Sequence, residues 1–367
     1  MLFIFLHQIG KMKKVFLETH NIKNPATGLG TFNYGLIKGL SHQDLSDVEI
    51  TLSAYKPQTL KDEFKDMFKY KKVYSFNRYK AFSVSTKHDL WHSVNQNTKF
   101  EPSKVSKYLL TVHDVNFADQ ATMKDTSSKR GKLFYGKLER CHAITYISEF
   151  AKQHTHQYFD VPNVPEYVIY NGNPITALTE TTNYTPEFPV DKPFLYTIGD
   201  FLEKKNFESI VRMMQFVPDF NLILSGNNNK PAGDKIREAI IELKLQDRVF
   251  LTGKVSDAGK QFYLKNCAAF LFPSIGEGFG LPPIEAMRFG KPVFLANRAS
   301  LPEIGGEHAF YWDEFDPEHM ASEFYKGYDI YKNNVAFYEE KLTQRALSFN
   351  WDDAAKQYLE VYHSLLK

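Results

Sequence analysis

The stretch from residue 268 to residue 290 constrains the fold of this chain more than any other. It opens with Ala268–Phe272, an apolar run that is typical of a short buried strand. It closes with Pro283–Gly290, which is predicted to be a helix because prolines suit a first helical turn and Gly290 suits a helix end. A strand, a loop and a helix in this order indicate an α/β fold.

The loop between the predicted strand and helix contains three glycines, Gly276, Gly278 and Gly280. A loop of this kind brings backbone N–H groups to the positive end of a helix dipole, where anions bind. Glu277 and Glu285 flank the loop, and carboxylates accept hydrogen bonds from hydroxyl groups. Phosphate donors on one side and hydroxyl acceptors on the other predict a pocket for a sugar nucleotide.

The same residues resemble a known family signature. The string Pro273-Ser-x3-Glu277-Gly-Phe-Gly-Leu-Pro-x2-Glu285-Ala-Met is similar to that of retaining glycosyltransferases of the family-4 type, the glycosyl transferases group 1. The resemblance implies the GT-B fold, in which two Rossmann-like α/β domains face each other across a cleft and a C-terminal helix crosses back to the first domain. It extends from about Met12 to the end of the chain and is strongest over residues 268–305.

Length and composition favour two globular domains. The chain has 367 residues, which is long for one core, with 43% hydrophobic and 24% charged residues. The first eleven residues are apolar but too short to span a bilayer, and we expect translation to begin at Met12. The expected organisation is an N-terminal acceptor-binding domain over residues 1–175, a linker over 176–193, a nucleotide-sugar-binding domain over 194–348 and a crossover helix over 349–367.

Cysteine content indicates a reducing compartment. The two cysteines, Cys141 and Cys267, lie far apart in apolar surroundings and show no metal-ligand spacing. We expect both to be reduced core residues.

Positive charge is concentrated in the first half of the chain. Residues 1–172 carry 24 Lys+Arg and 16 Asp+Glu, a net charge of +8, and the remaining residues carry 21 and 27, a net charge of −6. A basic first half suggests an anionic surface or acceptor, and a solvated face without a partner is the open alternative. Residues 60–72 are predicted to form a basic amphipathic helix that either docks on an anionic membrane or covers the core.

A glycine loop follows the first predicted strand. Gly28 and Gly30 precede a helix predicted from Tyr34 onwards, and Asn33 stands where a dinucleotide fingerprint has its third glycine. The resemblance implies that Gly28 and Gly30 bind the donor, and an ordinary tight turn is the alternative.

Two histidines end predicted strands of the first domain, His92 and His113. Ligand-binding groups of open α/β sheets collect at the carboxyl ends of strands, although a lone histidine is usually structural. The run Thr-Val-His113-Asp114 resembles the family segment whose histidine faces the donor sugar, which implies a catalytic role for His113. Asp114 and His92 are candidates for acceptor binding.

Two lysines follow the first predicted strand of the second domain. Lys204 and Lys205 resemble the family element Gly-x4-Arg/Lys-Lys-Asn, which implies that Lys205 contacts the leaving diphosphate and that Lys204 supports it; surface lysines are the alternative. Asp200 stands where some members carry a basic residue. The resemblance makes Glu277 catalytic and assigns donor binding to a larger set: Gly226, Gly278, Phe279, Gly280, Leu281 and Glu285.

The expected activity is transfer of a hexose-type sugar from a nucleotide diphosphate-sugar to an acceptor hydroxyl with retention of configuration. It would serve surface polysaccharide, lipopolysaccharide or glycolipid assembly. No cofactor and no metal are expected, because lysines and a helix end supply the positive charge.

The expected partners are the nucleotide-sugar donor, a saccharide or lipid-linked saccharide acceptor and an anionic membrane surface, with no nucleic acid. The expected location is the cytoplasm, including the inner face of the cytoplasmic membrane. The alternatives are a catalytically silent carbohydrate- or nucleotide-binding relative, a phosphorylase-like enzyme of the same fold, and a nicotinamide oxidoreductase, which Asn33 disfavours.

Overall fold

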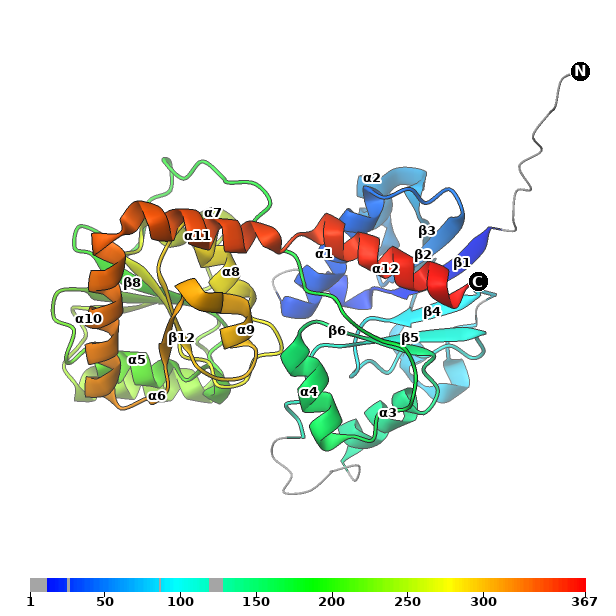
Figure 1. Cartoon of the computed structure of the whole chain (residues 1–367), viewed down its shortest axis with the longest axis horizontal. Coiled ribbons are helices and arrows are strands. Elements are labelled where there is room, and N and C mark those ends of the chain that lie inside the picture. The colour runs from blue at the N-terminus through cyan, green and yellow to red at the C-terminus, as the bar shows by residue number, and fades with distance from the viewer. Residues whose placement is uncertain (1–11, 25–26, 86, 119–127) are drawn as a thin grey trace, which may run out of the picture. The chain divides into compact units, whose positions relative to one another are not determined.

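The computed structural model forms two compact units, each built on its own parallel sheet (Figure 1). The first unit runs to Gly172 and is completed by Asn350–Lys367, and the second unit is Asn173–Phe349. The expected leader, residues 1–11, lies outside the described residues. The structure describes residues 12–24, 27–85, 87–118 and 128–367.

The described part of the first unit has a seven-stranded sheet in the order β3-β2-β1-β4-β5-β6-β7. This is the doubly wound order, in which the chain starts near the middle and changes direction between β1 and β4. Its inner strands β2, β1, β4, β5 and β6 are rich in buried apolar residues, as expected for a parallel sheet that is covered on both faces, whereas the edge strands β3 and β7 are not. The strands are β1 Lys13–Glu18, β2 Val48–Ala54, β3 Lys69–Lys72, β4 Leu90–Ser93, β5 Lys107–Val112, β6 Ala143–Tyr146 and β7 Glu166–Val168.

Helices and short 3-10 turns connect these strands and cover the sheet. The α-helices of the first unit are α1 Gly28–Ser41, α2 Pro57–Phe64, α3 Lys129–Leu138, α4 Glu149–Tyr158 and α12 Trp351–Leu365, and its 3-10 turns are η1 His20–Lys23, η2 Lys65–Met67, η3 Ser75–Arg78 and η4 Lys80–Phe82.

The C-terminal helix α12 packs along α1 of the first unit, as the resemblance implied. The contact is close because glycines face it. A Cβ atom at Gly35 would lie 2.2 Å from the Trp351 ring, and one at Gly39 would lie 2.3 Å from the Trp351 carbonyl oxygen. Gly172 meets the same tryptophan at 2.4 Å. The absence of side chains at these three positions therefore makes room for Trp351.

The second unit repeats this topology with a six-stranded sheet in the order β10-β9-β8-β11-β12-β13, so its switch of direction lies between β8 and β11. The strands are β8 Phe194–Ile198, β9 Asn221–Ser225, β10 Val249–Gly253, β11 Ala269–Phe272, β12 Val293–Ala296 and β13 Phe310–Trp312. The helices are η5 Glu203–Lys205, α5 Phe207–Met213, α6 Pro231–Glu242, α7 Asp257–Asn266, α8 Leu281–Met287, α9 Leu301–Gly305, η6 Gly306–His308, α10 Pro317–Asn333 and α11 Val335–Ser348.

The basic helix predicted over residues 60–72 is shorter than expected. Helix α2 ends at Phe64, because Lys65 adopts a left-handed backbone with φ of 52°. The chain then turns through η2 into β3, an edge strand that pairs with β2. The lysine stripe that suggested one helix is therefore divided between a helix and a strand.

Residues 176–193, expected to be a linker, pack on the second unit. Gln261 donates a hydrogen bond to Thr179 Oγ1 at 3.0 Å, and the Phe188 ring stacks on Phe250 with centroids 5.2 Å apart. The polar composition of this stretch concealed the few side chains that anchor it.

The glycine loop near residue 28 also differs from the prediction. Helix α1 already begins at Gly28, and its N-cap Thr27 accepts a hydrogen bond from the backbone N–H of Gly30 at 3.2 Å. Gly28 and Gly30 therefore lie in the first turn of a helix.

Two further expectations concern the core and the membrane. Cys141 and Cys267 are both buried and unpaired, which confirms them as core residues. Across the described residues, no helix is long and apolar enough to cross a bilayer.

Candidate functional site

The second unit brings Lys205 and Glu277 together at the switch point of its sheet. Lys205 follows β8 through the turn η5, and Glu277 follows β11, the neighbouring strand. Lys205 Nζ lies 2.5 Å from Glu277 Oε1. Ligands of open α/β sheets bind outside the carboxyl ends of the strands at such a switch point. Lys205 and Glu277, two of the three residues to which the resemblance gives a part in catalysis, therefore meet where the topology favours a ligand.

Backbone and hydroxyl contacts join the two loops that carry this pair. Ser274 Oγ lies 2.6 Å from Glu277 Oε1 and 3.1 Å from the Lys204 carbonyl oxygen, which also accepts a hydrogen bond from the Ile275 N–H at 2.8 Å. Ser300 Oγ lies 3.0 Å from the Glu277 carbonyl oxygen. Hydrogen bonds of this kind hold the two loops in place before a ligand binds, which favours catalysis by the side chains that the loops carry.

The electrostatics of the pair keep Glu277 ionised. Burial raises the pKa of Glu277, but the charges of Lys205 and Lys204 outweigh burial, so the pKa lies below its ordinary value. The side chains of Lys205 and Glu277 remain 13% and 12% exposed. A charged and partly accessible pair at this position is suited to exchange its internal contact for contacts with a charged, hydroxylated ligand.

Glycines let the strand ends beside this pair approach closely. Gly226, after β9, has φ of 130°, and a Cβ atom there would lie 1.8 Å from the Gly199 carbonyl oxygen. Gly280 is the N-cap residue of α8 with φ of 117°, and a Cβ atom there would lie 2.9 Å from the Leu301 side chain. Both backbones require glycine, which explains two of the predicted donor-binding positions in structural terms.

The remaining donor-binding candidates lie around α8. Gly278 and Phe279 precede this helix, Leu281 begins it and Glu285 lies within it. The Phe279 side chain is buried.

Glu285 has a partner that the sequence analysis missed. Lys260 Nζ, from α7, lies 2.9 Å from Glu285 Oε1 and 3.3 Å from Asp257 Oδ1. Burial raises the pKa of Glu285, and the charge of Lys260 opposes this shift. No spacing in the sequence connects residues 260 and 285, since the contact arises only when α7 and α8 pack.

Asp200 also has a cationic neighbour. Lys230 Nζ, from the residue that precedes α6, lies 2.8 Å from Asp200 Oδ2. The acidic residue that departs from the family pattern is therefore paired in this chain with a lysine 30 positions later.

In the first unit, His113 follows β5 and is 8% exposed. Its Nε2 lies 2.8 Å from the Val94 carbonyl oxygen, and Phe32 packs edge-on against its ring with centroids 4.7 Å apart. A carbonyl oxygen only accepts, so Nε2 carries the proton. Burial lowers the pKa of His113, although the Val94 carbonyl and Asp114 oppose the shift. The neutral ring therefore presents Nδ1 as a hydrogen-bond acceptor.

His92 belongs to the core, and we withdraw it as an acceptor-binding residue. It is fully buried, with Nδ1 2.7 Å from Tyr362 Oη and Nε2 2.7 Å from Thr111 Oγ1. Burial lowers its pKa to about 3. Asp114 closes a turn: its Oδ1 accepts a hydrogen bond from the Asn116 N–H at 3.2 Å.

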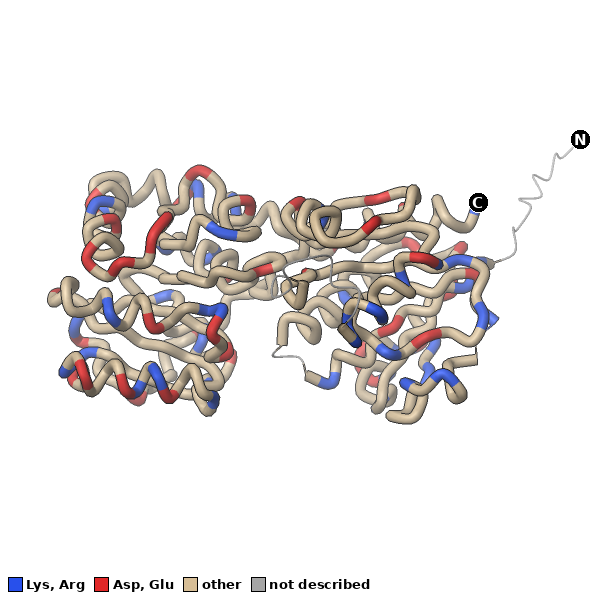
Figure 2. The backbone as a smooth tube through the Cα atoms, turned by 90° about the horizontal axis from the view of Figure 1, so that it is seen from below, with Lys and Arg blue, Asp and Glu red and all other residues tan. Residues whose placement is uncertain are grey.

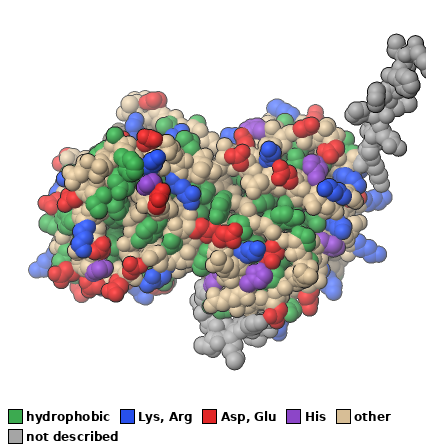
Figure 3. All heavy atoms as spheres, viewed as in Figure 1, with side chains coloured by type: hydrophobic (Ala, Val, Ile, Leu, Met, Phe, Trp, Pro, Cys, Tyr) green, Lys and Arg blue, Asp and Glu red, His purple; other side chains and the backbone are tan. Residues whose placement is uncertain are grey.

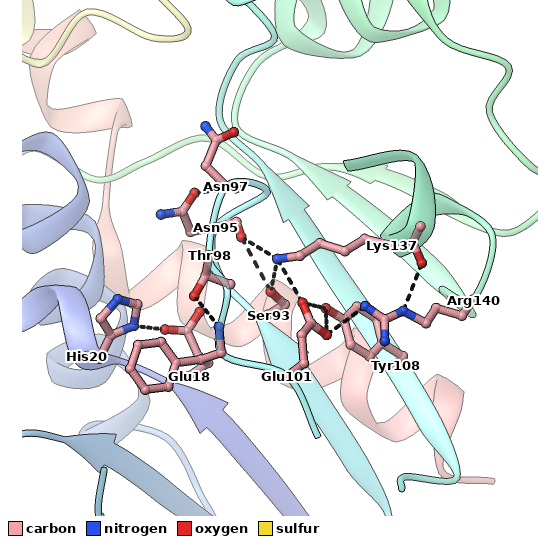
Figure 4. A network of polar contacts seen from close by, with 12 residues as sticks. Glu18, His20, Ser93, Asn95, Asn97, Thr98, Glu101, Tyr108, Lys137 and Arg140 are labelled. Atoms are coloured by element: carbon pink, nitrogen blue, oxygen red, sulfur yellow. Dashed lines mark hydrogen bonds and ion pairs between the residues drawn. The ribbon is translucent and has the colours of Figure 1, made fainter. Parts of the chain in front are cut away.

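A buried polar network lies at the switch point of the first unit (Figure 4). Lys137 reaches from α3 toward the loop after β4, where its Nζ lies 3.1 Å from the Asn95 carbonyl oxygen and 3.3 Å from Ser93 Oγ. Glu101 balances its charge at 3.2 Å. On the β1 side, Glu18 contacts the His20 ring. Lys137 is far in the sequence from the polar residues that it contacts, so no sequence pattern predicts that they meet.

Comparisons with known proteins identify the family of the second unit. Residues 180–338 match the family model described as Glycosyl transferases group 1. These residues form a group 1 glycosyltransferase domain. The match covers the switch point with Lys205 and Glu277, so the resemblance inferred from the signature is confirmed.

The group 1 domain lies in a chain whose similarity to glycosyltransferases extends over nearly its whole length. The chain is 21% identical to O-antigen chain mannosyltransferase B of Escherichia coli, over 96% of this chain and 100% of that protein. A glycosyltransferase from Rickettsia africae ESF-5 superposes with a TM-score of 0.73 and 18% identity, over 98% of this chain and 99% of that one. Anabaena Alr3699/HepE, solved in complex with UDP and glucose, superposes with a TM-score of 0.71 and 14% identity, over 96% and 100%.

These similarities confirm the predicted GT-B fold and support a glycosyltransferase. Within the described residues, no group of three or more His, Cys, Asp or Glu side chains is arranged to hold a metal ion.

Proposed function

We propose that the chain is a retaining hexosyltransferase that moves a sugar from a nucleotide diphosphate-sugar to a hydroxyl of a saccharide or lipid-linked saccharide acceptor. The observation that carries the proposal is the Lys205–Glu277 pair at the switch point of the group 1 domain. A cation and a carboxylate side by side match the two ends of the donor. The cation meets the diphosphate, and the carboxylate meets the sugar hydroxyls.

The proposed reaction breaks the bond between the anomeric carbon and the diphosphate oxygen, and the bonding electrons leave with the diphosphate. The acceptor oxygen bonds to the anomeric carbon on the same face, and its proton passes to the leaving phosphate. No protein base is then required. Negative charge grows on the diphosphate in the transition state, where Lys205 stabilises it with support from Lys204. Removing one such donor commonly costs about 2.7–4 kcal/mol of transition-state stabilisation.

Other residues divide the donor between them in this proposal. Glu277 holds a sugar hydroxyl or stabilises positive charge at the anomeric carbon, and Glu285 accepts hydrogen bonds from the ribose. His113 accepts a hydrogen bond from the donor sugar through Nδ1, which its bond to Val94 leaves as the acceptor nitrogen. Gly226 and Gly278–Leu281 contact the donor through their backbones, and Gly28 and Gly30 allow its phosphate to approach α1.

The similarity to an O-antigen chain mannosyltransferase supports surface polysaccharide or lipopolysaccharide assembly as the setting and mannose as the first sugar to test. The structure of Alr3699/HepE with UDP and glucose supports a nucleotide-sugar donor. We propose that the reaction needs no metal or other cofactor, since lysines supply the positive charge. We also propose that it takes place in the cytoplasm, including the inner face of the cytoplasmic membrane.

The first test is thermal stability against UDP-, GDP- and ADP-sugars in wild type and in Lys205→Ala. A ligand at about 100 times its Kd stabilises a protein by about 2.7 kcal/mol. We expect one nucleotide to raise the melting temperature of the wild type and to lose most of this effect in Lys205→Ala. A matched control is Lys235→Ala, which removes an exposed lysine paired with Glu203 at 2.9 Å. A response that is the same in all three proteins would contradict the assignment of Lys205 to the diphosphate.

A second test follows the reaction with the donor found in the first. NMR of the glycoside product reports whether the anomeric configuration is retained, and turnover after extensive treatment with EDTA reports whether a metal is needed. Inversion of configuration would overturn the proposed mechanism. Selective donor binding without turnover or donor hydrolysis would favour a catalytically silent relative.

A further inference from the structure

The connection between β3 and β4 exposes an unusual group of aromatic side chains. Its described residues, 73–85 and 87–89, form no α-helix, only the short turns η3 and η4. Tyr74, Phe76, Tyr79 and Phe82 are 46%, 49%, 62% and 58% exposed. Single exposed apolar side chains are ordinary in soluble proteins, but neighbouring exposed aromatics mark an interaction surface.

Hydrogen bonds of the segment itself hold these rings outward. Asn77 accepts a hydrogen bond from the Tyr74 N–H at 2.8 Å and donates one to the Phe82 carbonyl oxygen at 2.8 Å. Val73 and Val84, at the two ends, are 2% and 3% exposed and join the core of the first unit. The segment is thus anchored at both ends, and the rings between the anchors stay in solvent.

The rings also contact one another. Tyr74 and Phe76 stack with centroids 5.2 Å apart, and the edge of Phe82 meets Phe76 at 5.7 Å. Tyr74, Phe76 and Phe82 thus form an apolar wedge, with Tyr79 exposed beside them in the chain, and their contacts occupy ring faces that a flat ligand, such as a nucleic acid base, would use for stacking.

Positive charge surrounds the wedge. Residues 69–82 contain five Lys or Arg and no Asp or Glu. Lys72 Nζ lies 5.1 Å from the centroid of the Tyr74 ring, so one of these charges is held directly at the aromatic group. Acidic and basic side chains are interspersed over the face seen in Figure 3, and both units carry residues of either sign in Figure 2. The basic residues of the segment are Lys69, Lys71, Lys72, Arg78 and Lys80.

We propose that residues 69–82, the aromatic–basic segment, bind the surface of an anionic lipid bilayer. Aromatic side chains favour the level of the lipid head groups, and lysines and arginines are attracted to anionic lipids. The proposal builds on the proposed function, because a lipid-linked acceptor is presented at a membrane. The binding itself requires no transferase activity. It also replaces the predicted amphipathic helix over residues 60–72 with a segment that begins at its last residues, 69–72, and extends to Phe82.

The test is co-flotation with vesicles of mixed phosphatidylglycerol and phosphatidylethanolamine and with vesicles of phosphatidylcholine alone. We expect the wild-type protein to bind the anionic vesicles and not the neutral ones. Binding should weaken between about 0.1 M and about 0.5 M salt, where charges are screened over shorter distances. Equal binding to both vesicles, or to neither, would overturn the proposal.

Two variants separate the contribution of the aromatic side chains to vesicle binding from that of the positive charges. Replacing the four exposed aromatics by serine should abolish flotation at every salt concentration. Replacing Lys69, Lys71 and Lys72 by glutamine should weaken binding by about fivefold for each charge removed near the surface. The matched control replaces four exposed apolar residues of the second unit by serine, and it should float like the wild type. These control residues are Phe216, Ile241, Phe337 and Leu347, which are 42%, 64%, 48% and 54% exposed.

Two further measurements keep this proposal distinct from the proposed function. Transfer to a short water-soluble acceptor should be unchanged in the aromatic variant, whereas loss of flotation should be complete. If the wild type transfers sugar but never floats, the membrane proposal fails alone, and if it floats without any donor response, the proposed function fails alone. Binding of a single-stranded oligonucleotide that depends on the four aromatics, without flotation, would assign the segment to nucleic acid instead.

Discussion

The two switch points of the molecule have the same topology and each holds a Lys–Glu ion pair, but the two lysines differ in burial. In the second unit, the Lys205–Glu277 pair lies at the end of the central strands with both side chains 12–13% exposed. In the first unit, Lys137 is fully buried, its partner Glu101 is 17% exposed, and Glu18 is 1% exposed. Lys205 keeps partial access to solvent and can meet a charged ligand. Lys137 is enclosed by protein and holds the loop after β4.

The difference shows that position in a doubly wound sheet favours a ligand site without determining what the site binds. A partly exposed lysine such as Lys205 can exchange its carboxylate partner for a phosphate at little cost in free energy, because water already solvates part of its charge. The fully buried Lys137 has no such freedom, since removing Glu101 leaves its charge in a medium that solvates it poorly. We therefore expect substitutions at the first switch point to affect stability and those at the second to affect activity.

The largest effect on stability should come from Glu101→Leu. This change leaves buried Lys137 without its nearest counter-charge, and breaking a buried pair in this way costs about 3 kcal/mol or more. Urea unfolding followed by fluorescence in a Trp312→Phe background measures this, because Trp91 and Trp351 then report on the first unit alone.

The double variant Glu101→Leu/Lys137→Met sharpens the interpretation. Because the double variant also removes the unpaired positive charge of Lys137, it should be more stable than Glu101→Leu. If the single and double variants are equally stable, Lys137 does not depend on Glu101, and the contrast between the two switch points is wrong.

The matching change at the second switch point is Lys205→Ala, which should lower kcat by about 10²- to 10³-fold because a cation at the departing diphosphate is lost. Its stability should change much less than that of Glu101→Leu, since the partner left unpaired here, Glu277, is 12% exposed, whereas Lys137 is fully buried. Steady-state kinetics with the donor identified by thermal shift provides the measurement. A large loss of stability with unchanged kcat would make this pair structural as well.

The sequence allowed the second unit to be predicted more fully than the first. The signature around Glu277 and Glu285 lies in one continuous stretch, and Lys205 follows a predicted strand by a few residues. Local spacing in the sequence was therefore sufficient to predict these residues. In contrast, Lys260 reaches Glu285, and Trp351 meets Gly39, only through tertiary packing. No local pattern reports such contacts.

The errors in the first unit have physical causes. The lysines of residues 60–72 satisfied a helical period, but Lys65 adopts a left-handed backbone and the following residues form an edge strand. His92 ended a predicted strand as His113 does, yet α12 covers it completely. Whether a strand-end histidine is accessible depends on a helix 270 residues later in the chain, which the strand itself does not specify.

The close packing of α12 on α1 predicts an intermediate effect. Gly39→Ala places a methyl group where Trp351 now lies, since a Cβ atom would be 2.3 Å from its carbonyl oxygen. Overpacking of this kind costs about 1–3 kcal/mol. The control is Gly136→Ala in α3, where nothing lies within 4 Å and the better helix propensity of alanine should stabilise the unit by about 0.5–1 kcal/mol. Opposite signs in urea unfolding are expected, and equal effects would contradict the packing argument.

The smallest expected effect concerns acid stability of the first unit. His92 has a pKa of about 3 in the folded protein, against 6.5 for the free group, because burial disfavours its charged form. Between these values the unfolded chain binds a proton that the folded chain does not. The free energy of unfolding should therefore not depend on His92 above pH 6.5. Below pH 6.5, towards pH 3, His92 should lower it by about 1.4 kcal/mol per pH unit.

Urea unfolding between neutral pH and pH 5, in wild type and in His92→Gln, measures this dependence. Glutamine keeps hydrogen-bonding capacity beside Tyr362 and Thr111 but does not titrate, so the variant should lose less stability per pH unit than the wild type. His319→Gln, at an exposed position of α10 in the second unit, controls for removal of a histidine as such. Identical slopes for His92→Gln and wild type would show that His92 becomes protonated within the fold, and its withdrawal from the acceptor site would then have to be reconsidered.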